Sequence, residues 1–257
     1  MFSIHKYLDK NIRSCGWDSN LGSAFVKKPL TFPMSTWESP KLHSGTFSTM
    51  VYRILVLFAH PAFHRSRINR RLIASIRDLE NVTINDLYEE YPDFYINVKR
   101  EQQLLIEHDI IIFQHPFYWY SSPAILKQWE DLVLEFGFAY GPGGTKLQKK
   151  LVLSAITAGG PLSAYQRDGF NYFTVRELLT PFEQTARFCG MIYLPPFIVS
   201  GALRMREEKE ISANSARYRR VVEDLRDDRI DLARLQQLNY FNEALEETSS
   251  NTSLHGN

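Results

Sequence analysis

From Val51 onward, the chain alternates short runs that are almost wholly apolar with longer amphipathic stretches. A strand that is covered by helices on both faces has no solvent side, so its sequence is a continuous apolar run. Parallel neighbours also need a long crossover between them, which is usually a helix. The alternation therefore predicts a parallel sheet with helices on both faces, which is the α/β class.

Five apolar runs are expected to form strands, at residues 52–59, 82–88, 109–115, 150–157 and 191–200. Amphipathic patterns predict helices over residues 67–79, 99–108, 123–137 and 175–190, and a last charged helix over residues 207–225. This order favours a flavodoxin-like, doubly wound five-stranded parallel sheet. Ligands of such sheets bind at the carboxyl ends of the strands, where the winding reverses. The loops after the first, third and fourth strands are therefore the expected site.

The chain is expected to have three parts. Residues 1–49 are rich in Ser, Thr, Pro and Gly without a sustained period, so we interpret them as an extension that is poorly ordered or precedes the natural start at Met50. Residues 50–228 are expected to form the flavodoxin-like domain. Residues 229–257 are expected to add a C-terminal helical segment and a flexible tail that ends in TSSNTSLHGN.

Composition argues against several classes of function. The 30 Lys and Arg residues nearly balance the 29 Asp and Glu residues, so bulk charge gives no reason to expect nucleic acid as a partner. Cys15 and Cys189 stand outside any CxxC or CxxH spacing, which argues against a disulfide framework and a zinc site. No apolar run approaches the roughly 20 residues that cross a bilayer. We therefore expect a protein of the reducing cytoplasm.

The loop after the first predicted strand, AHPAFHRSRIN, lacks the glycines of a G-x-G-x-x-G dinucleotide fingerprint. It offers instead Ser66 as an N-cap, the backbone N–H groups of Arg67 and Ile68, and the Asn69 side chain. A helix start presents unpaired N–H donors and the positive end of the helix dipole, which suits a terminal phosphate. The alternative is that Ser66 simply caps a helix.

Two histidines flank a proline in the same loop. His60 and His64 are four residues apart, but no third ligand accompanies them, so no metal site is predicted. His60 alone is typical of a hydrogen-bonded structural histidine, with contact to a ligand as the alternative.

The loop after the third predicted strand belongs to the stretch QHPFYWYSSPAILKQWED. Ser121 or Ser122 is expected to cap the next helix, with Pro123 in its first turn. Turns at strand ends normally carry small polar residues, so a run of four aromatics needs a partner that covers it. One interpretation is an apolar wall for a planar ring, and the other is a subunit interface or a core plug. The four residues are Phe117, Tyr118, Trp119 and Tyr120.

Two glycine clusters follow. In ITAGGPLSAYQ, Gly159 and Gly160 leave room for a ligand near the main chain and offer N–H donors, with an ordinary tight turn as the alternative. Tyr165 is interpreted as a pocket lid or a surface aromatic. The second cluster, AYGPGGTKL, lacks the ending of a phosphate-binding P-loop and is interpreted as a mobile loop beside the site.

These motifs resemble the flavodoxin-fold NAD(P)H:quinone oxidoreductases, and most closely the ancillary subunits of Kef glutathione-regulated potassium-efflux systems. The resemblance covers residues 50–226. It rests on AHP followed by SRIN, on QHPFYWYSSPAILKQWED, on FAYGPGGTKL, on TAGG and on CGMIYLPPF. The long third-loop motif is the most specific of these.

The resemblance implies a flavin, FMN with FAD as the alternative, and NAD(P)H as co-substrate. His60, Ser66, Arg67, Ile68 and Asn69 would hold its phosphate and ribityl end. The flavin ring would lie against Phe117, Tyr118, Trp119 and Tyr120, and its polar edge would face Thr157, Ala158, Gly159 and Gly160. Tyr165 matches the tyrosine of a catalytic proton relay, whereas no histidine matches its second member.

The activity implied is two-electron transfer from NAD(P)H through the flavin to a quinone, with ping-pong kinetics because both substrates use one stacking position. A homodimer is expected from the same resemblance. The alternative function is a regulatory subunit that binds a Kef-type potassium channel, which would place the protein at the cytoplasmic face of the inner membrane. An α/β-hydrolase is excluded, since no G-x-S-x-G elbow follows a predicted strand.

Overall fold

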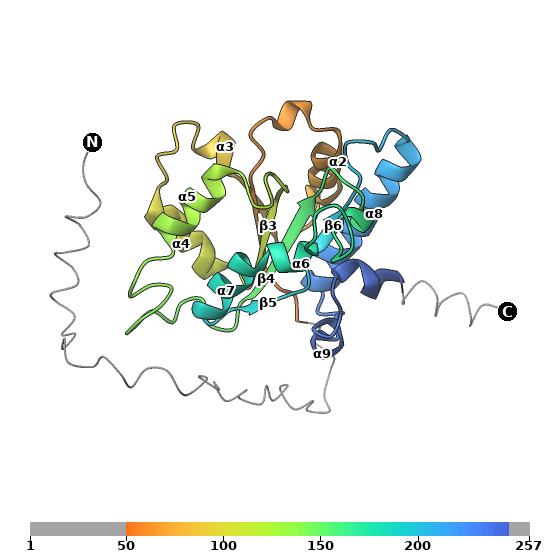
Figure 1. Ribbon diagram of the computed structural model, residues 1–257. Helices are drawn as coiled ribbons and strands as arrows, with labels where there is room; N and C mark the ends of the chain where they lie inside the picture. Colours follow the sequence, from red (N-terminus) through yellow and green to blue (C-terminus); the bar gives the residue numbers. More distant parts are fainter. Residues whose placement is uncertain (1–49, 247–257) are drawn as a thin grey trace, which may run out of the picture. The chain divides into compact units, whose positions relative to one another are not determined.

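The computed structural model describes residues 50–246 (Figure 1). The predicted extension 1–49 and the predicted tail lie outside the described residues. Within residues 50–246, no helix is long and apolar enough to cross a membrane.

The predicted sheet is confirmed. Its strands stand in the order β2-β1-β3-β4-β5, and every pair is parallel. Val56 lies opposite Ile84 on one side and Ile112 on the other, so the apolar runs meet in register. The strands are β1 (Ile54–Phe58), β2 (Val82–Asp86), β3 (Ile110–Pro116), β4 (Leu151–Thr157) and β5 (Ile192–Tyr193).

The fifth predicted strand, residues 191–200, is two strands and not one. β5 ends at Tyr193, and a sixth strand, β6 (Phe197–Val199), then pairs with β4 further along. Pro195 and Pro196 separate the two. Proline has no N–H to donate to a sheet ladder, so the pairing stops there and resumes after both prolines.

The helices and two 3₁₀ turns lie between these strands or, as α8 and α9 do, follow the last of them. They are η1 (Phe63–Arg65), α2 (Arg67–Ile76), α3 (Leu87–Glu90), α4 (Val98–Glu107), α5 (Ala124–Val133), η2 (Leu162–Ala164), α6 (Val175–Leu178), α7 (Thr180–Phe188), α8 (Glu208–Arg226) and α9 (Leu232–Leu235). Two buried clusters, one on each face of the sheet, form the core. This is the two-sided covering that the apolar strands predict.

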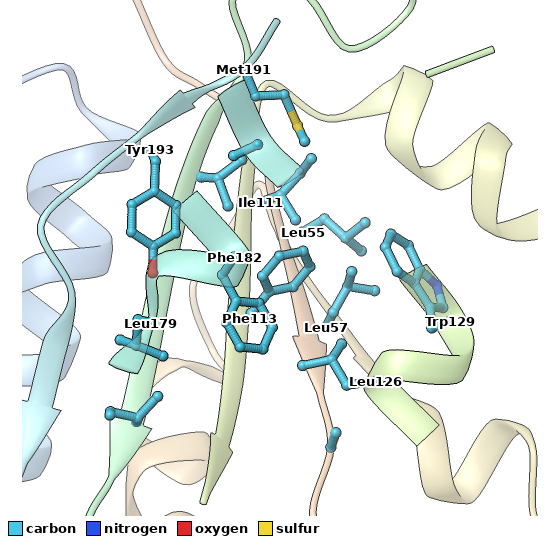
Figure 2. Packing of buried hydrophobic residues seen from close by; sticks show 14 of the residues in the cluster. Leu55, Leu57, Ile111, Phe113, Leu126, Trp129, Leu179, Phe182, Met191 and Tyr193 are labelled. Atoms are coloured by element: carbon cyan, nitrogen blue, oxygen red, sulfur yellow. The ribbon is translucent and has the colours of Figure 1, made fainter. Parts of the chain in front are cut away.

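One face of the sheet packs against α4, α5 and α7. Figure 2 shows Phe113 of β3 close to Trp129 of α5 and Phe182 of α7. The ring centroids are 6.0 Å apart in both pairs. Successive strand residues point to opposite faces, so Leu55 and Leu57 join this cluster. The other face, with Ile54 and Val56, packs against α2 and α8.

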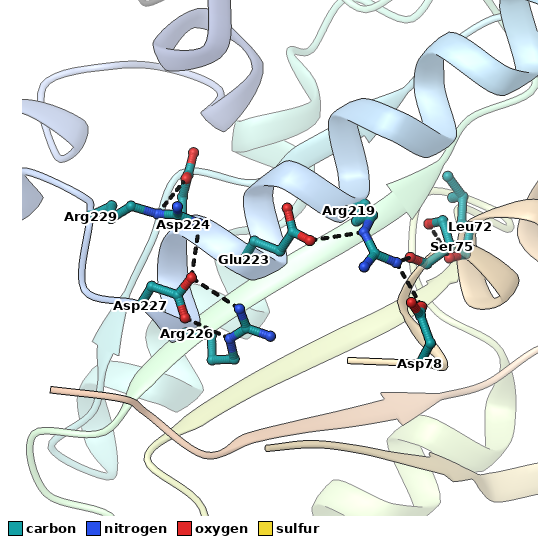
Figure 3. A network of polar contacts seen from close by, with 9 residues as sticks. All are labelled: Leu72, Ser75, Asp78, Arg219, Glu223, Asp224, Arg226, Asp227 and Arg229. Carbon is teal, nitrogen blue, oxygen red and sulfur yellow. Dashed lines mark hydrogen bonds and ion pairs between the residues drawn. The ribbon is translucent and has the colours of Figure 1, made fainter. Parts of the chain in front are cut away.

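A polar network ties α8 to α2 across the second face (Figure 3). The Arg219 guanidinium donates to the Ser75 carbonyl at 2.7 Å and to Asp78 at 2.6 Å, and it also donates to Glu223 at 2.8 Å. The carbonyl and the Asp78 carboxylate both stand at the end of α2. The network therefore fixes the helix whose other end enters the predicted site.

The segment after α8 covers the β5–β6 edge of the sheet. Leu235, Phe241 and Leu245 are buried in the same cluster as the sheet residues. The Asn242 side chain accepts from Ile198 N–H at 2.9 Å and donates to Ile198 O at 3.0 Å, as a neighbouring strand would. An open edge presents unpaired N–H and C=O groups, and this segment satisfies them. Residues beyond 228 thus pack on the core as far as residue 245.

Candidate functional site

The start of α2 offers unpaired donors. Ser66 is the N-cap, and its Oγ accepts from Asn69 N–H at 3.2 Å. Within residues 50–246, the N–H groups of Arg67 and Ile68 donate to no acceptor. The Arg67 side chain turns away to donate to the carbonyls of Met205 and Arg206, at 3.4 and 3.0 Å. The helix start therefore presents two free N–H groups and a positive dipole end, as an anion requires.

Asn69 joins the first site loop to the fourth strand. Its Nδ2 donates to Ser66 Oγ at 3.2 Å and to Thr157 Oγ1 at 3.0 Å. Asn69 is 2 % exposed, and its Oδ1 accepts no hydrogen bond in the described chain. A buried polar atom without a partner is rare, so this oxygen is a candidate acceptor for a ligand hydroxyl.

His60 organises the first loop. Its Nδ1 accepts from Ala62 N–H at 3.1 Å, and burial lowers the pKa of the ring, which is therefore neutral at physiological pH. The ring meets Tyr118 edge to face at a centroid distance of 6.2 Å, so the first and third loops are in contact. No group of three metal-ligating side chains converges anywhere in residues 50–246.

The aromatics of the third loop form a strained hairpin. Tyr118 and Ser121 exchange two backbone hydrogen bonds of 3.1 and 2.9 Å. Between them, Trp119 and Tyr120 both have positive φ, 50° and 64°. That is the geometry of a type I′ turn, which normally carries Asn-Gly because side chains with a Cβ are disfavoured there. Strain of this kind, of order 1–3 kcal/mol per residue, concentrates at functional sites.

The hairpin changes the predicted start of the next helix. α5 begins at Ala124 with Pro123 as the N-cap, and no side chain caps it. The prediction of a Ser121 or Ser122 cap is wrong. Since the Ser121 backbone is paired with Tyr118, the serine belongs to the turn and not to the helix.

The four aromatics divide into one buried ring and three exposed ones. Phe117 is 7 % exposed, and its ring contacts Tyr120 and Tyr165 at centroid distances of 6.5 and 6.0 Å. Trp119 is 93 % exposed, and Tyr118 and Tyr120 are about half exposed. Phe117 is therefore the buried ring that anchors the turn, and the other three rings are open to solvent.

A residue that sequence reasoning missed holds this turn. Tyr120 OH donates to Asn171 Oδ1 at 3.1 Å, and Asn171 N–H donates to Ala164 O at 2.9 Å. Asn171 thus links the aromatic turn to the loop after β4. The sequence around Asn171 gives no sign of this role. The one signal is that Asn171 follows Tyr165 in the loop after β4, which the sequence predicts to be part of the site.

The fourth loop supplies more free donors. The N–H groups of Gly159 and Gly160 donate to no acceptor within residues 50–246, whereas Ala158 N–H donates to Val199 O at 2.9 Å. Neither glycine has positive φ. A Cβ at Gly160 would meet only ordinary contacts of 3.5 Å or more, and one at Gly159 would meet the end of the Leu203 side chain. The backbone itself does not require these glycines, which favours room for a ligand over an ordinary tight turn.

The glycine cluster at residues 139–147 does not lie beside the site. It connects the end of α5 to the start of β4, so it stands at the amino-terminal edge of the sheet. Lys149 N–H donates to Gly190 O at 2.8 Å, just before β5 begins, which places the connection at that edge. Its interpretation as a loop beside the site is wrong, because α5 carries the chain to the opposite end of the sheet.

His115 lies beneath the aromatic turn with no exposed surface. Its Nδ1 is 2.9 Å from Pro116 O, and its ring stacks on Phe182 at 5.7 Å. Burial lowers the pKa of His115 from 6.5 to about 4. The unfolded chain therefore binds a proton below pH 6.5 that the folded chain binds only near pH 4.

We expect this histidine to reduce stability as the pH falls from about 6.5 toward 4. A pKa lowered by this much corresponds to a loss of about 2 kcal/mol between pH 7 and pH 5. Glu130 acts in the opposite direction, because burial raises its pKa to about 7. Chemical unfolding of the wild type and of His115→Gln at both pH values isolates the histidine, and equal pH dependence in the two proteins would contradict the assignment.

These contacts bring the three predicted loops together at the carboxyl edge of the sheet. His60 contacts Tyr118, Asn69 bonds Thr157, and Phe117 N–H donates to Thr157 O at 2.8 Å. Free N–H groups stand at the start of α2 and at the two glycines, and exposed aromatic faces lie between the loops. The arrangement fits a planar heteroaromatic ring with an anionic tail.

Comparison with known proteins gives the family. Residues 52–222 match a protein family whose description is a flavodoxin-like fold. The ancillary protein KefG of the glutathione-regulated potassium-efflux system of Enterobacter sp. (strain 638) is 48 % identical over 156 residues, which are 61 % of this chain and 85 % of that protein. The uncharacterized NAD(P)H oxidoreductase YrkL of Bacillus subtilis is 47 % identical over 156 residues, 61 % of this chain and 90 % of its own length.

Two solved structures extend the comparison. General stress protein 14 of Treponema denticola, in complex with FMN, has a TM-score of 0.63 and 34 % identity, and the match covers 67 % of this chain and 99 % of that one. An NADPH-quinone reductase from P. pentosaceus has a TM-score of 0.61 and 34 % identity, covering 66 % and 97 %. Because these matches span nearly all of the relatives and most of the described residues, the chain belongs to the flavodoxin-like fold family, among the NAD(P)H:quinone oxidoreductases and the Kef ancillary proteins.

Proposed function

We propose that this protein binds FMN at the three loops and reduces quinones with electrons from NAD(P)H. The observation that carries the proposal is the exposed aromatic turn, which is flanked on both sides by backbone N–H groups without an acceptor in the described chain. A flat apolar surface between two sets of donors suits a ring that is apolar on its faces and polar at its edge and tail. FMN is favoured over FAD because FMN is bound in the Treponema denticola relative.

The start of α2 would hold the phosphate and ribityl end of the cofactor. The N–H groups of Arg67 and Ile68 and the hydroxyl of Ser66 are the phosphate donors in this proposal, and Asn69 Oδ1 accepts from a ribityl hydroxyl. Ile68 is buried and keeps the helix start in place. His60 is a further donor in this proposal, because its Nδ1 accepts from Ala62 N–H, which leaves the proton of the neutral ring on Nε2, and the ring also contacts Tyr118.

The ring would lie on the aromatic turn, with its polar edge toward the fourth loop. Phe117 anchors the turn, while Tyr118, Trp119 and Tyr120 present their faces. Thr157, Ala158, Gly159 and Gly160 border the polar edge, where the two glycine N–H groups donate. Ala158 takes part through contact alone, because both its N–H and its carbonyl are used within the chain.

When bound, the flavin supplies the two-electron chemistry, accepting hydride from NAD(P)H and then reducing a quinone that takes the same stacking position. The chain's own task is to hold the ring rigidly and to exclude water. Fixed N–H donors at the polar edge stabilise negative charge there without reorganisation. Burial, followed by the charge of Tyr120, raises the pKa of Tyr165, so its phenol is protonated at neutral pH and is the proposed proton donor.

The purified protein tests the assignment directly. A yellow sample should release FMN on denaturation, identified by chromatography, and NAD(P)H should bleach its visible absorption before a quinone restores it. Parallel lines in double-reciprocal plots at several quinone concentrations are expected for a shared stacking position. A colourless protein that takes up neither FMN nor FAD would rule out the redox function.

Trp119→Ala should weaken the affinity for flavin or quinone by about 1–3 kcal/mol, the range for burying a large aromatic side chain. Phe188→Ala is the matched control, because Phe188 is also an exposed ring but ends α7 at the opposite edge of the sheet. Fluorescence titration with FMN and steady-state KM for the quinone give both quantities. If both variants bound flavin and quinone equally tightly, the aromatic turn would serve packing and not ligand binding.

A second function is favoured by the relatives that are Kef ancillary proteins. In this proposal the chain docks on a Kef-type potassium channel at the cytoplasmic face of the inner membrane and stimulates it. A homodimer, in which a second copy covers part of the exposed aromatic surface, is compatible with both functions. Co-purification with the channel, together with flavin-free activation of potassium efflux, would separate regulation from catalysis.

A further inference from the structure

The tip of the aromatic turn, residues 118–121, is joined to its surroundings on two sides. On the side of the first loop, the Tyr118 ring meets the His60 ring at 6.2 Å. On the side of the fourth loop, Tyr120 OH donates to Asn171 Oδ1 at 3.1 Å. Apart from the two backbone bonds inside the turn, this is the one hydrogen bond that residues 118–121 form within residues 50–246. The bond to Asn171 therefore fixes the side of the turn that faces the fourth loop.

The turn needs such a contact because its backbone is strained. Trp119 and Tyr120 have φ of 50° and 64°, in the left-handed region that residues with a Cβ disfavour. A strained backbone persists only where the structure around it holds it in place. The contacts with His60 and Asn171 are therefore part of what keeps the aromatic rings where they are.

Asn171 itself belongs to a tightly closed loop. Its N–H donates to Ala164 O at 2.9 Å, next to Tyr165 in the chain. Gly169 comes so close to the start of the loop that a Cβ there would lie 2.6 Å from Ser163 O and 2.9 Å from Ala164 O, so no side chain fits. The position of Asn171 relative to Tyr165 is thus fixed by the backbone.

Tyr165 in turn lies beside one of the glycine donors. A Cβ on Gly160 would be 3.5 Å from the Tyr165 ring and 3.9 Å from its hydroxyl. The Phe117 ring contacts both Tyr165 and Tyr120, at centroid distances of 6.0 and 6.5 Å. Burial and then the charge of Tyr120 raise the pKa of Tyr165, which also places the two phenols near each other. Gly160, Tyr165, Tyr120 and Asn171 therefore form one connected group.

We propose that Asn171 is a positioning residue for the flavin reaction. It holds the Tyr120 phenol, and through it the aromatic turn, at a fixed distance from Gly160 N–H and from the Tyr165 hydroxyl. A flat ring that lies on the turn then meets both groups with its polar edge, and the loops need not rearrange. This inference rests on the proposed function and adds to it a residue that acts through Tyr120.

Fluorescence titration of the flavin-free full chain with FMN measures the effect on the site. Asn171→Ala removes the acceptor and should weaken FMN binding about three- to tenfold, the change that corresponds to one hydrogen bond. Asn171→Asp keeps an acceptor oxygen at the same place and should restore the affinity to within about twofold of the wild type. If the alanine variant bound FMN as tightly as the wild type, or if aspartate failed to restore binding, the positioning role would be refuted.

A double-mutant cycle tests whether Asn171 acts through Tyr120. Tyr120→Phe removes the donor but keeps the ring, so it should weaken FMN binding by the same factor as Asn171→Ala. The double variant should bind no more weakly than either single variant, because all three lose the same bond. Tyr95→Phe is the matched control and should have no effect, since Tyr95 is 85 % exposed and its hydroxyl donates to no acceptor in the described chain. Losses that multiply in the double variant would mean that the two residues act independently.

Amide hydrogen exchange of the flavin-free protein gives a readout that does not depend on activity. Ser121 N–H donates to Tyr118 O at 2.9 Å and closes the turn. In Asn171→Ala this amide should exchange at least about threefold faster, whereas the amide of the buried Val56 in β1 should be unaffected. Equal acceleration at both amides would indicate a general loss of stability and refute the positioning role. A wild type that takes up no FMN would refute the proposed function itself.

Discussion

Ser66→Asp is expected to weaken FMN binding about 100-fold, or about 2.7 kcal/mol, without destabilising the fold. Aspartate is as good an N-cap as serine, so the cap of α2 is kept. The new carboxylate, however, would stand beside the proposed phosphate position. Two like charges about 4 Å apart repel each other by about 4 kcal/mol at the effective dielectric of a protein surface, and partial solvation reduces that figure. Fluorescence titration of the flavin-free protein measures the change.

Ser66→Asn is the matched control for this charge effect. Asparagine also caps helices well and has nearly the shape of aspartate, but it is neutral. It should therefore bind FMN within a few-fold of the wild type. If the aspartate variant bound FMN as tightly as the asparagine variant, the phosphate would not lie at the start of α2.

Glu101→Ala is expected to lower the free energy of unfolding by about 3–5 kcal/mol, the range for leaving buried partners of a charge uncompensated. The Glu101 carboxylate has no exposed surface, and it accepts from Asn85 Nδ2 at 2.8 Å, Tyr91 OH at 2.6 Å and Trp129 Nε1 at 2.8 Å. Arg100 forms an ion pair with it. Removing this acceptor from α4 leaves three buried donors unsatisfied, on β2, on α5 and in the loop after α3.

Denaturant unfolding followed by circular dichroism measures this loss. Glu107→Ala makes the same chemical change on the same helix, but the Glu107 side chain is 40 % exposed and its ion pair with Arg53 is 3.7 Å long. Surface pairs of this kind contribute about 0–1 kcal/mol. Similar losses in the two variants would mean that the buried network does not hold the three elements together.

The strands were predictable because each is a continuous apolar run. The predicted runs 52–59, 109–115 and 150–157 contain or overlap β1, β3 and β4, and their ends differ by no more than two residues. The run at 191–200 predicts one strand where the structure has two. Its apolar pattern continues through Pro195 and Pro196, whereas the hydrogen bonding of the sheet stops there. The apolar pattern of a sequence indicates which residues are buried. Proline interrupts the hydrogen bonds between strands without changing that burial, so the pattern does not reveal the interruption.

The loops of the candidate site were also predictable, since the rule that ligands bind at carboxyl ends of parallel strands depends on topology alone. The contacts within them were not. Asn69 reaches Thr157 across 88 positions of sequence, and Tyr120 reaches Asn171 across 51. The type I′ turn at Trp119 and Tyr120 contradicts local preference. The paired backbone of Tyr118 and Ser121 and the hydrogen bond from Tyr120 to Asn171 hold two aromatic residues at positive φ.

By itself, the sequence determined the class of the fold, the order of its elements and the three loops that meet at one edge, because apolar periodicity and chain connectivity are local properties that a single chain carries. Only the tertiary structure decided which polar atoms remain without partners. It also showed that Glu101 is a buried acceptor, that the glycine cluster at 139–147 lies at the far edge of the sheet, and that the C-terminal segment packs on the core as far as residue 245. Hydrogen bonds and burial depend on residues that are distant in sequence, and their positions exist only once the chain has folded.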